Sequence, residues 1–159
     1  MSAPMAISSA RRIQKEMIAL SQEPIHGVTV KSGPEESKDH SCVEIVMGIK
    51  GAEGTIYHGE EFELRFRINE RYPFESPEVV FQGSNIPLHP HVYSNGHICL
   101  SILGDEWSPA LTIQSVCLSI VSMLSSCKEK KRPPDDQFYV RTASLNPKNT
   151  RWRYHDDSV

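Results

Sequence analysis

Long apolar runs and an excess of either charge are both missing from this sequence. No stretch approaches the roughly 18 to 20 apolar residues that cross a bilayer, and the N-terminus, MSAPMAISSARRIQKE, turns polar too soon for a signal peptide. The chain carries 17 basic and 20 acidic residues, a formal charge of −3, so its overall charge does not attract nucleic acid. These absences favour a cytoplasmic or nuclear protein that binds neither membranes nor nucleic acid.

Closely spaced cysteine pairs are missing as well. The four cysteines, Cys42, Cys99, Cys117 and Cys127, are irregularly spaced and include no C-x-x-C pair, which argues against a disulfide framework and a zinc ribbon. Each thiol must therefore be judged by its own surroundings. With 159 residues the chain fits one domain, 1–159, and it has no linker long enough to divide it.

Helical periodicity predicts two helices. Ser8 and Ser9 can cap the first helix. Its apolar stripe consists of Ala10, Ile13, Met17 and Leu20. Its basic residues lie on other faces: Arg11, Arg12 and Lys15. The second helix is expected over 112–126, where Leu118 falls roughly opposite the apolar stripe and is expected at the surface.

Alternation of apolar and polar residues predicts strands between the two helices. Apolar residues alternate in 43–49 and again in 62–68, which is typical of half-buried antiparallel strands. Two prolines then preclude a helix and lead into a third strand at 79–81. Residues 24–41 are rich in Gly, Pro, Ser and charge, so we expect a loop there with a short strand at 28–30. The pattern as a whole indicates an α+β fold.

The basic segment KEKKR, residues 128–132, directly follows the second predicted helix. It either complements the C-terminal end of the helix dipole, which is the favoured interpretation, or forms a nuclear-localisation or partner-binding patch. From Pro133 onward the sequence has no sustained periodicity but is aromatic at Phe138, Tyr139, Trp152 and Tyr154. This tail is either draped over the core by its aromatic side chains or a partly disordered arm.

The segment HPHVYSNGHICL, residues 89–100, puts three histidines beside one thiol. A metal site would recruit His89, His91, His97 and Cys99, but an intervening proline and a single thiol match structural metal spacings poorly. A cysteine hydrolase is also disfavoured, because His97 is too close in sequence to serve as the base and no helix start precedes the thiol. An acyl carrier needs only a loop-borne thiol with polar neighbours, which accepts an acyl group that an amine then removes.

Several motifs, in order, resemble those of ubiquitin-conjugating enzymes. They are GTIYHGEEFELRFRI, YPFESPEVVF, HPHVYSNGHICLSIL and EWSPALT, followed by a helix, and the resemblance covers about residues 8–137. The details RYPFESPEV, SSCKEKKRPPD and a W-x-YHDD ending are most similar to the type W branch. That branch attaches single ubiquitins to the α-amino terminus of substrates, preferably disordered ones.

The resemblance implies a fold and a set of sites. The fold is α+β, with an N-terminal helix, a four-stranded antiparallel meander, a crossover helix, and a shortened C-terminal tail, about 138–159, that is mobile from about residue 143. By resemblance, Cys99 forms the thioester with ubiquitin. The surfaces for the activating enzyme and for RING-type or U-box ligases are Arg11, Arg12, Lys15, Phe74, Ser108, Pro109 and Ala110. Leu118 falls where the crossover helix presses on the donor ubiquitin, which holds the thioester ready for attack.

The active-site residues depart from the family motif, His-Pro-Asn, whose asparagine supports the loop and the developing oxyanion. Here the three residues are His89, Pro90 and His91. A neutral His91 can donate a hydrogen bond or accept a proton from the amine, and a structural role stays open. Ser101 stands where many relatives have an aspartate. A second acid survives as Asp136, but the KEKKR segment is long and leaves its position open.

The missing acid bears on the acceptor. A lysine amine has a pKa of about 10.4 and an α-amine about 7.8, so near neutral pH the α-amine has roughly 400 times more of its nucleophilic form. We therefore predict single ubiquitins on substrates with flexible N-termini. The resemblance implies no metal or bound cofactor, because ATP is used only by the activating enzyme. A weak homodimer and a different ubiquitin-like modifier stay open, whereas Cys99 argues against an inactive scaffold.

Overall fold

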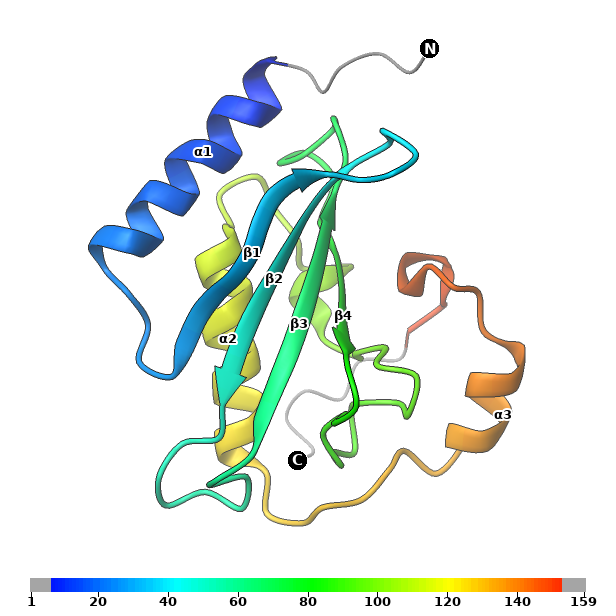
Figure 1. Ribbon diagram of the computed structural model, residues 1–159. Coiled ribbons are helices and arrows are strands. Elements are labelled where there is room, and N and C mark those ends of the chain that lie inside the picture. Colours follow the sequence, from blue (N-terminus) through cyan, green and yellow to red (C-terminus); the bar gives the residue numbers. More distant parts are fainter. Residues whose placement is uncertain (1–6, 153–159) are drawn as a thin grey trace.

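The computed structural model describes residues 7–152, which form a four-stranded sheet covered by helices (Figure 1). The first helix, α1, spans Ile7–Gln22. It is followed by β1 (Val28–Glu36), β2 (Val43–Lys50), β3 (Glu61–Ile68) and β4 (Glu78–Gln82), and then by α2 (Ile113–Ser126). The strands are antiparallel in the order β1-β2-β3-β4, which confirms the predicted meander.

The alternating strands β2 and β3 supply the sheet's half of the core. Four apolar residues of β3 are at most 2% exposed: Phe62, Leu64, Phe66 and Ile68. Three of them pair with buried residues of β2, for example Phe66 with Ile45, because opposed residues of antiparallel strands point to the same face. The charged residues between them point to the other face, as the alternation predicted.

Strand β1 is longer than the sequence indicated. The predicted short strand at 28–30 extends to Glu36, although only its first residue is buried. Its pairing with β2 is irregular between Val30 and Glu35. Gly33 lies in this stretch with φ +85°, and a Cβ there would come within 2.3 Å of the Glu44 carbonyl oxygen. Glycine therefore allows the strand to continue through a stretch that reads as a turn.

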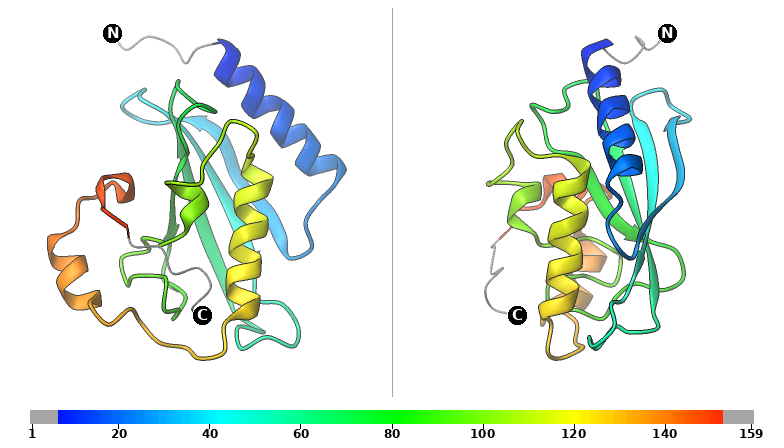
Figure 2. Two further views of the ribbon diagram at one scale, coloured as in Figure 1. Left: turned by 180° about the vertical axis from the view of Figure 1, so that it is seen from behind. Right: turned by 90° about the vertical axis from the view of Figure 1, so that its left-hand side faces the viewer.

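Helix α2 lies across the face of the sheet that is turned away in Figure 1 (Figure 2). It begins within one residue of the predicted start at 112, and Thr112 caps it in a reciprocal capping box with Ser115. The residues that it buries are Ile113, Val116, Cys117, Ile120, Met123 and Leu124. Leu118 is 49% exposed, which confirms the expectation that it lies opposite the buried stripe.

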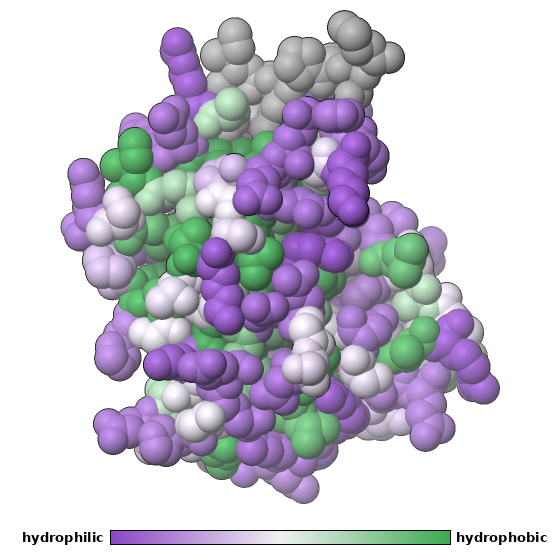
Figure 3. All heavy atoms as spheres, in the orientation of Figure 1, coloured by the Kyte–Doolittle hydropathy of each residue, from purple (hydrophilic) through white to green (hydrophobic). Residues whose placement is uncertain are grey.

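The predictions for α1 need two corrections. The helix already includes residues 7 to 9, so Ser9 does not cap it; instead its hydroxyl donates to the Glu70 and Tyr72 carbonyls. Ala10 is exposed rather than in the core. It lines an apolar groove of about 350 Å³ between α1 and the start of β2, and Figure 3 shows apolar side chains where α1 meets the sheet. Within residues 7–152 no helix is long and apolar enough to cross a membrane.

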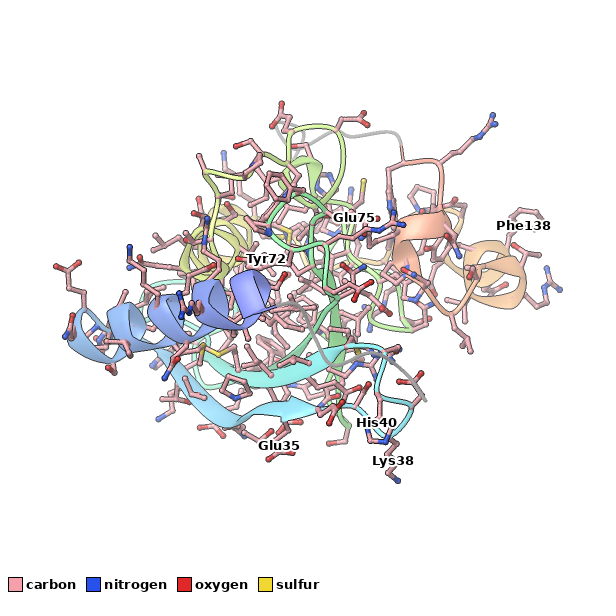
Figure 4. All side chains as sticks on the ribbon, turned by 90° about the horizontal axis from the view of Figure 1, so that it is seen from above. Glu35, Lys38, His40, Tyr72, Glu75 and Phe138 are labelled. Carbon is pink, nitrogen blue, oxygen red and sulfur yellow. The ribbon has the colours of Figure 1, made fainter. Side chains whose placement is uncertain are left out.

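The C-terminal segment contains helices that the sequence did not indicate. The short α3 (Asp136–Thr142) stands on the side of the sheet away from α1 (Figure 1), and the single turn η2 (Pro147–Asn149) returns the chain toward β4. Of the tail's aromatic residues, Tyr139 is buried against the body, whereas Phe138 is 63% exposed and points outward in Figure 4. Tyr154 and the YHDD ending lie outside the described residues. Mobility of the tail from about residue 143 stays a prediction.

Candidate active site

The active-site loop, residues 86–99, is shaped mainly by backbone hydrogen bonds. A bridge joins Val92 to Ile98, and a second joins His97 to Val80 of β4. The turn between them requires Gly96, which has φ +93° and would bring a Cβ within 2.0 Å of the Phe81 carbonyl oxygen. Cys99, the last residue of the loop, follows this turn. Its amide donates to the His91 carbonyl at 2.8 Å, and the residue is 9% exposed.

His89 supports this loop as a neutral side chain. It is fully buried; its Nε2 contacts the Met123 carbonyl at 3.1 Å, and its Nδ1 accepts from the His91 amide at 2.9 Å. Both contacts are satisfied by the tautomer with its proton on Nε2. Burial lowers the pKa of His89 to about 4, so the ring is uncharged at neutral pH. The loop is thereby attached to the last turn of α2.

His91 belongs to the surface between the loop and α2. The residue is 7% exposed, and its ring lies 5.6 Å from that of His89 at an angle of 65°. With Leu100, Leu118 and Met123 it lines a pocket of about 340 Å³. The structure thus brings His91 and Leu118 to one surface, although they lie far apart in the sequence.

The histidines that a metal site would need have other partners. Both ring nitrogens of His89 are engaged, and His97 Nδ1 lies 2.7 Å from the Tyr139 hydroxyl. Burial lowers the pKa of His97 as well. Within residues 7–152 no three His, Cys, Asp or Glu side chains are grouped so that they could hold a metal ion. The described donors therefore do not converge in the way the zinc hypothesis required.

Ser101 begins a 3₁₀ turn, η1 (Ser101–Leu103), immediately after the active-site loop. Its hydroxyl donates to Glu106 Oε2 at 2.9 Å, and the Glu106 amide donates back to the Ser101 carbonyl. Sequence reasoning missed Glu106, because the residue lies in a loop with no periodicity. Residue 101 is thus a serine bonded to a nearby carboxylate.

Both acids of the PPDD motif contact the turn of the active-site loop. Asp136 accepts from the Ser94 amide at 2.7 Å and from the Ser94 hydroxyl at 2.9 Å. Asp135 accepts from the Tyr93 hydroxyl at 2.9 Å. The sequence left the position of Asp136 open; the structure places its carboxylate on Ser94, where two hydrogen bonds hold it.

An aromatic cluster that the sequence did not predict attaches the C-terminal segment to this turn. Tyr93 stacks on Tyr139 at 3.8 Å, and Trp152 lies 6.0 and 5.6 Å from the two rings. The Tyr139 hydroxyl also lies 2.8 Å from Thr150 Oγ1. Burial is the largest cause that raises the pKa of Tyr93, and the hydrogen bond to Asp135 is the second. The draped-tail interpretation is therefore correct up to Trp152.

The predicted partner-binding residues gather at the opposite end of the molecule. Phe74 is 80% exposed, and the Trp107 indole donates to the Pro73 carbonyl beside it. Arg12 joins α1 to the loop containing residues 108–110, because it donates to the Pro109 carbonyl at 2.9 Å and to the Leu111 carbonyl at 3.0 Å. The remaining residues of the predicted surface are exposed or half-buried: Arg11, Lys15, Ser108, Pro109 and Ala110.

A buried carboxylate, missed by sequence reasoning, holds this end together. Glu16 is 7% exposed and accepts from Arg12 Nε at 2.8 Å, the Tyr72 hydroxyl at 2.6 Å and the Ile113 amide at 2.7 Å. It thus connects α1, the loop before Phe74 and the start of α2. Figure 4 shows Tyr72 beside the end of α1 and Glu75 on the side of η2, where Lys148 lies 4.0 Å from it.

Comparison with known proteins gives a consistent result. A family model described as ubiquitin-conjugating enzyme matches residues 12–154. The chain is 59% identical over 151 residues to a probable ubiquitin-conjugating enzyme E2 W-A of Danio rerio, covering 95% of this chain and 98% of the relative. It is 56% identical over 155 residues to ubiquitin-conjugating enzyme E2 W of Caenorhabditis elegans, covering 98% and 100%.

A solved structure is similar as well. The ubiquitin-conjugating enzyme E2 UbcA1 of Agrocybe aegerita superimposes with a TM-score of 0.80 at 45% identity, covering 88% of this chain and 98% of that one. Similarity in sequence and in fold therefore extends over nearly the whole chain, including the active-site loop.

Proposed function

This chain belongs to the ubiquitin-conjugating enzyme family, cysteine transferases that carry a thioester, and we propose that it passes ubiquitin from Cys99 to the α-amino group at a substrate's N-terminus. As a member of the family it acts with ubiquitin, an activating enzyme and ubiquitin ligases. The proposal concerns the acceptor, the number of ubiquitins transferred and the residues that perform each step.

The reaction consists of two acyl transfers. The Cys99 thiolate attacks the thioester between ubiquitin and the activating enzyme, and the activating enzyme's thiolate leaves. A neutral amine then attacks the new thioester carbonyl, the tetrahedral oxyanion collapses, and the Cys99 thiolate leaves as the amine loses its extra proton. His91, next to this site, either donates a hydrogen bond to the oxyanion or accepts the amine proton.

The observation that carries the proposal is the small supply of free acid near Cys99. Ser101 occupies a position where many relatives have an aspartate, and its hydroxyl donates to Glu106. Asp136, the other candidate acid, accepts two hydrogen bonds from Ser94. Both carboxylates are thus already engaged in hydrogen bonds with Ser101 or Ser94. Such a site favours an amine that is already neutral, and an α-amine is neutral roughly 400 times more often than a lysine near pH 7.

The remaining parts of the proposal concern partners. The activating enzyme and the RING-type or U-box ligases bind the end that carries α1, Phe74 and residues 108–110. Leu118 contacts the donor ubiquitin, and the exposure of this apolar side chain on α2 supports that role. Substrates have flexible N-termini and receive single ubiquitins. We also propose that the protein acts in the cytoplasm or nucleus and needs no metal or cofactor of its own, since ATP is used upstream.

Two assays test the proposal in sequence. The first mixes the protein with activating enzyme, ubiquitin and ATP, and looks for a thiol-sensitive adduct; wild type should form it and Cys99→Ala should not. Absence of the adduct in wild type would indicate a different modifier or an inactive fold.

The second assay isolates the charged enzyme and follows its discharge onto two matched peptides at pH 7.2. One peptide has a free N-terminus and no lysine; the other is N-acetylated and has one lysine. We expect discharge onto the α-amine to be faster by about two orders of magnitude, the size of the difference in neutral amine. Equal rates would refute the proposed acceptor. The variant Ser101→Asp supplies the missing acid and should raise the lysine rate more than the α-amine rate.

A further inference from the structure

Arg132 makes an unusual set of contacts with the active-site loop. Its Nη1 donates to the Pro87 carbonyl at 2.6 Å and to the Val92 carbonyl at 3.3 Å, and its Nη2 donates to the Ile86 carbonyl at 3.2 Å. Ile86 and Pro87 lie where the chain enters the His-Pro-His turn, and Val92 lies where it leaves. One guanidinium therefore joins the entry of this turn to its exit.

The other carbonyls of the turn are held within the loop or from the sheet side. The Tyr57 hydroxyl donates to the Leu88 carbonyl at 2.5 Å, and the Val92 amide donates to the His89 carbonyl at 3.1 Å. The His91 carbonyl accepts from the Cys99 amide. Because that last bond links Cys99 to the turn, a shift of the turn also moves the backbone of Cys99.

We propose that Arg132 is a positioning residue for ubiquitin transfer: by bonding the carbonyls at 86, 87 and 92 it fixes the turn that carries His91 and, through the His91 carbonyl, the place of Cys99. The requirement is for arginine. Its planar fork offers several N–H donors at fixed angles and can bond three carbonyls at once, whereas a lysine ammonium is a compact charge on a flexible stem.

The neighbouring basic residues of the KEKKR segment do not share this position. Lys130 pairs with Glu60 at 2.7 Å and lies 5.4 Å from the Tyr57 ring centre, so it attaches the segment to the β2–β3 loop. Lys131 is exposed, and its nearest acidic partner is Glu129, two residues away, at 3.8 Å. A change at Lys131 therefore removes the same charge one residue away without touching the turn.

The kinetic consequence is specific to the discharge step. The thiol remains present when Arg132 is replaced, so charging goes to completion. Attack on the thioester requires the thioester carbonyl, the amine and the His91 side chain to be correctly positioned relative to one another. A displacement of about 1 Å can lower the rate about 10²-fold. This inference does not depend on which amine is the acceptor.

The test compares Arg132→Lys, Arg132→Met and the control Lys131→Met. Each charged enzyme is followed in single-turnover discharge over a range of peptide concentrations, at a temperature where circular dichroism shows all variants folded. We expect both Arg132 variants to lose about tenfold in maximal discharge rate with an unchanged half-saturating concentration, and Lys131→Met to stay within about twofold of wild type. Amide NMR shifts of His91 and Cys99 should move in the Arg132 variants only.

Several outcomes would overturn the inference. A wild-type maximal rate in Arg132→Met would show that the loop needs no such contact. Full activity in Arg132→Lys would show that charge alone suffices. A change confined to the half-saturating concentration would assign Arg132 to substrate binding instead. These outcomes can be told apart from a failure of the proposed α-amine acceptor. That proposal predicts the ratio of the α-amine discharge rate to the lysine discharge rate, whereas this inference predicts that loss of Arg132 lowers both discharge rates.

Discussion

Acidification should destabilise this fold through His89. The imidazole is fully buried, contacts the Met123 carbonyl through Nε2 and accepts from the His91 amide at Nδ1. A second proton on Nδ1 would place an N–H against the N–H of His91, so burial and geometry both oppose the charged form. Burial accordingly lowers the pKa of His89 from 6.5 to about 4.

The sign and size of the effect follow from linkage between protonation and folding. Between the folded value of about 4 and the unfolded value of 6.5, the unfolded chain binds a proton that the folded chain does not, so the free energy of unfolding falls as the pH falls. Each pKa unit corresponds to about 1.4 kcal/mol, which gives about 3 kcal/mol once the pH is below 4. Between pH 7 and pH 5 this histidine should cost about 2 kcal/mol.

The measurement is urea-induced unfolding at pH 7 and pH 5, followed by tryptophan fluorescence, for wild type and His89→Gln. The glutamine amide can still donate toward the Met123 carbonyl but has no group that titrates in this range. Other groups, including His97 with its lowered pKa, contribute equally to both proteins and cancel. We expect wild type to lose about 2 kcal/mol more than the variant. Equal losses, within about 0.5 kcal/mol, would refute this account of His89.

Three further predictions concern surfaces and the tail. Leu118→Glu should leave the free energy of unfolding within about 0.5 kcal/mol of wild type but slow ligase-stimulated discharge about tenfold. The control Ser125→Glu, at an exposed position of the same helix, should leave the discharge rate unchanged; an equal loss in both variants would indicate nonspecific charge repulsion. Glu16→Ala should lower the free energy of unfolding by about 3 kcal/mol in urea denaturation, because three donors lose their acceptor; a loss below 1 kcal/mol would contradict its role as a connector. Tyr139→Phe should speed amide hydrogen exchange in 136–142 while leaving β3 unchanged, and unaltered exchange would show that its hydroxyl does not hold the tail.

The regular elements could be predicted where one face of an element is buried and the other is not. Strand β3 and helix α2 have this contrast, and their positions followed from periodicity alone. Strand β1 lacks it, because eight of its nine residues are exposed or half-buried and its pairing depends on main-chain hydrogen bonds to β2. Helix α3 lacks it too, since only Tyr139 is buried along its seven residues.

The candidate site also has parts that could be predicted from the sequence and parts that could not. His91, Cys99 and Ser101 lie within eleven residues of each other, so their proximity followed from the motif. Arg132 reaches its carbonyls across 40 to 46 residues. Contacts between a side chain and distant main-chain atoms leave no periodic signal in the sequence, because any residue supplies the carbonyl. For this reason the sequence indicated only a helix-end or surface role for the basic segment.

These supports bear on the histidine that replaces the family's asparagine. In the family pattern that asparagine supports the loop and the oxyanion with one side chain. Here Arg132 and Tyr57 bond the carbonyls around residue 91, and His89 attaches the turn to α2. Contacts from outside the turn thus hold carbonyls on both sides of residue 91. These contacts explain how the turn keeps its geometry when an imidazole stands in place of the family's asparagine, because the backbone on both sides of residue 91 is held by Arg132, Tyr57 and His89.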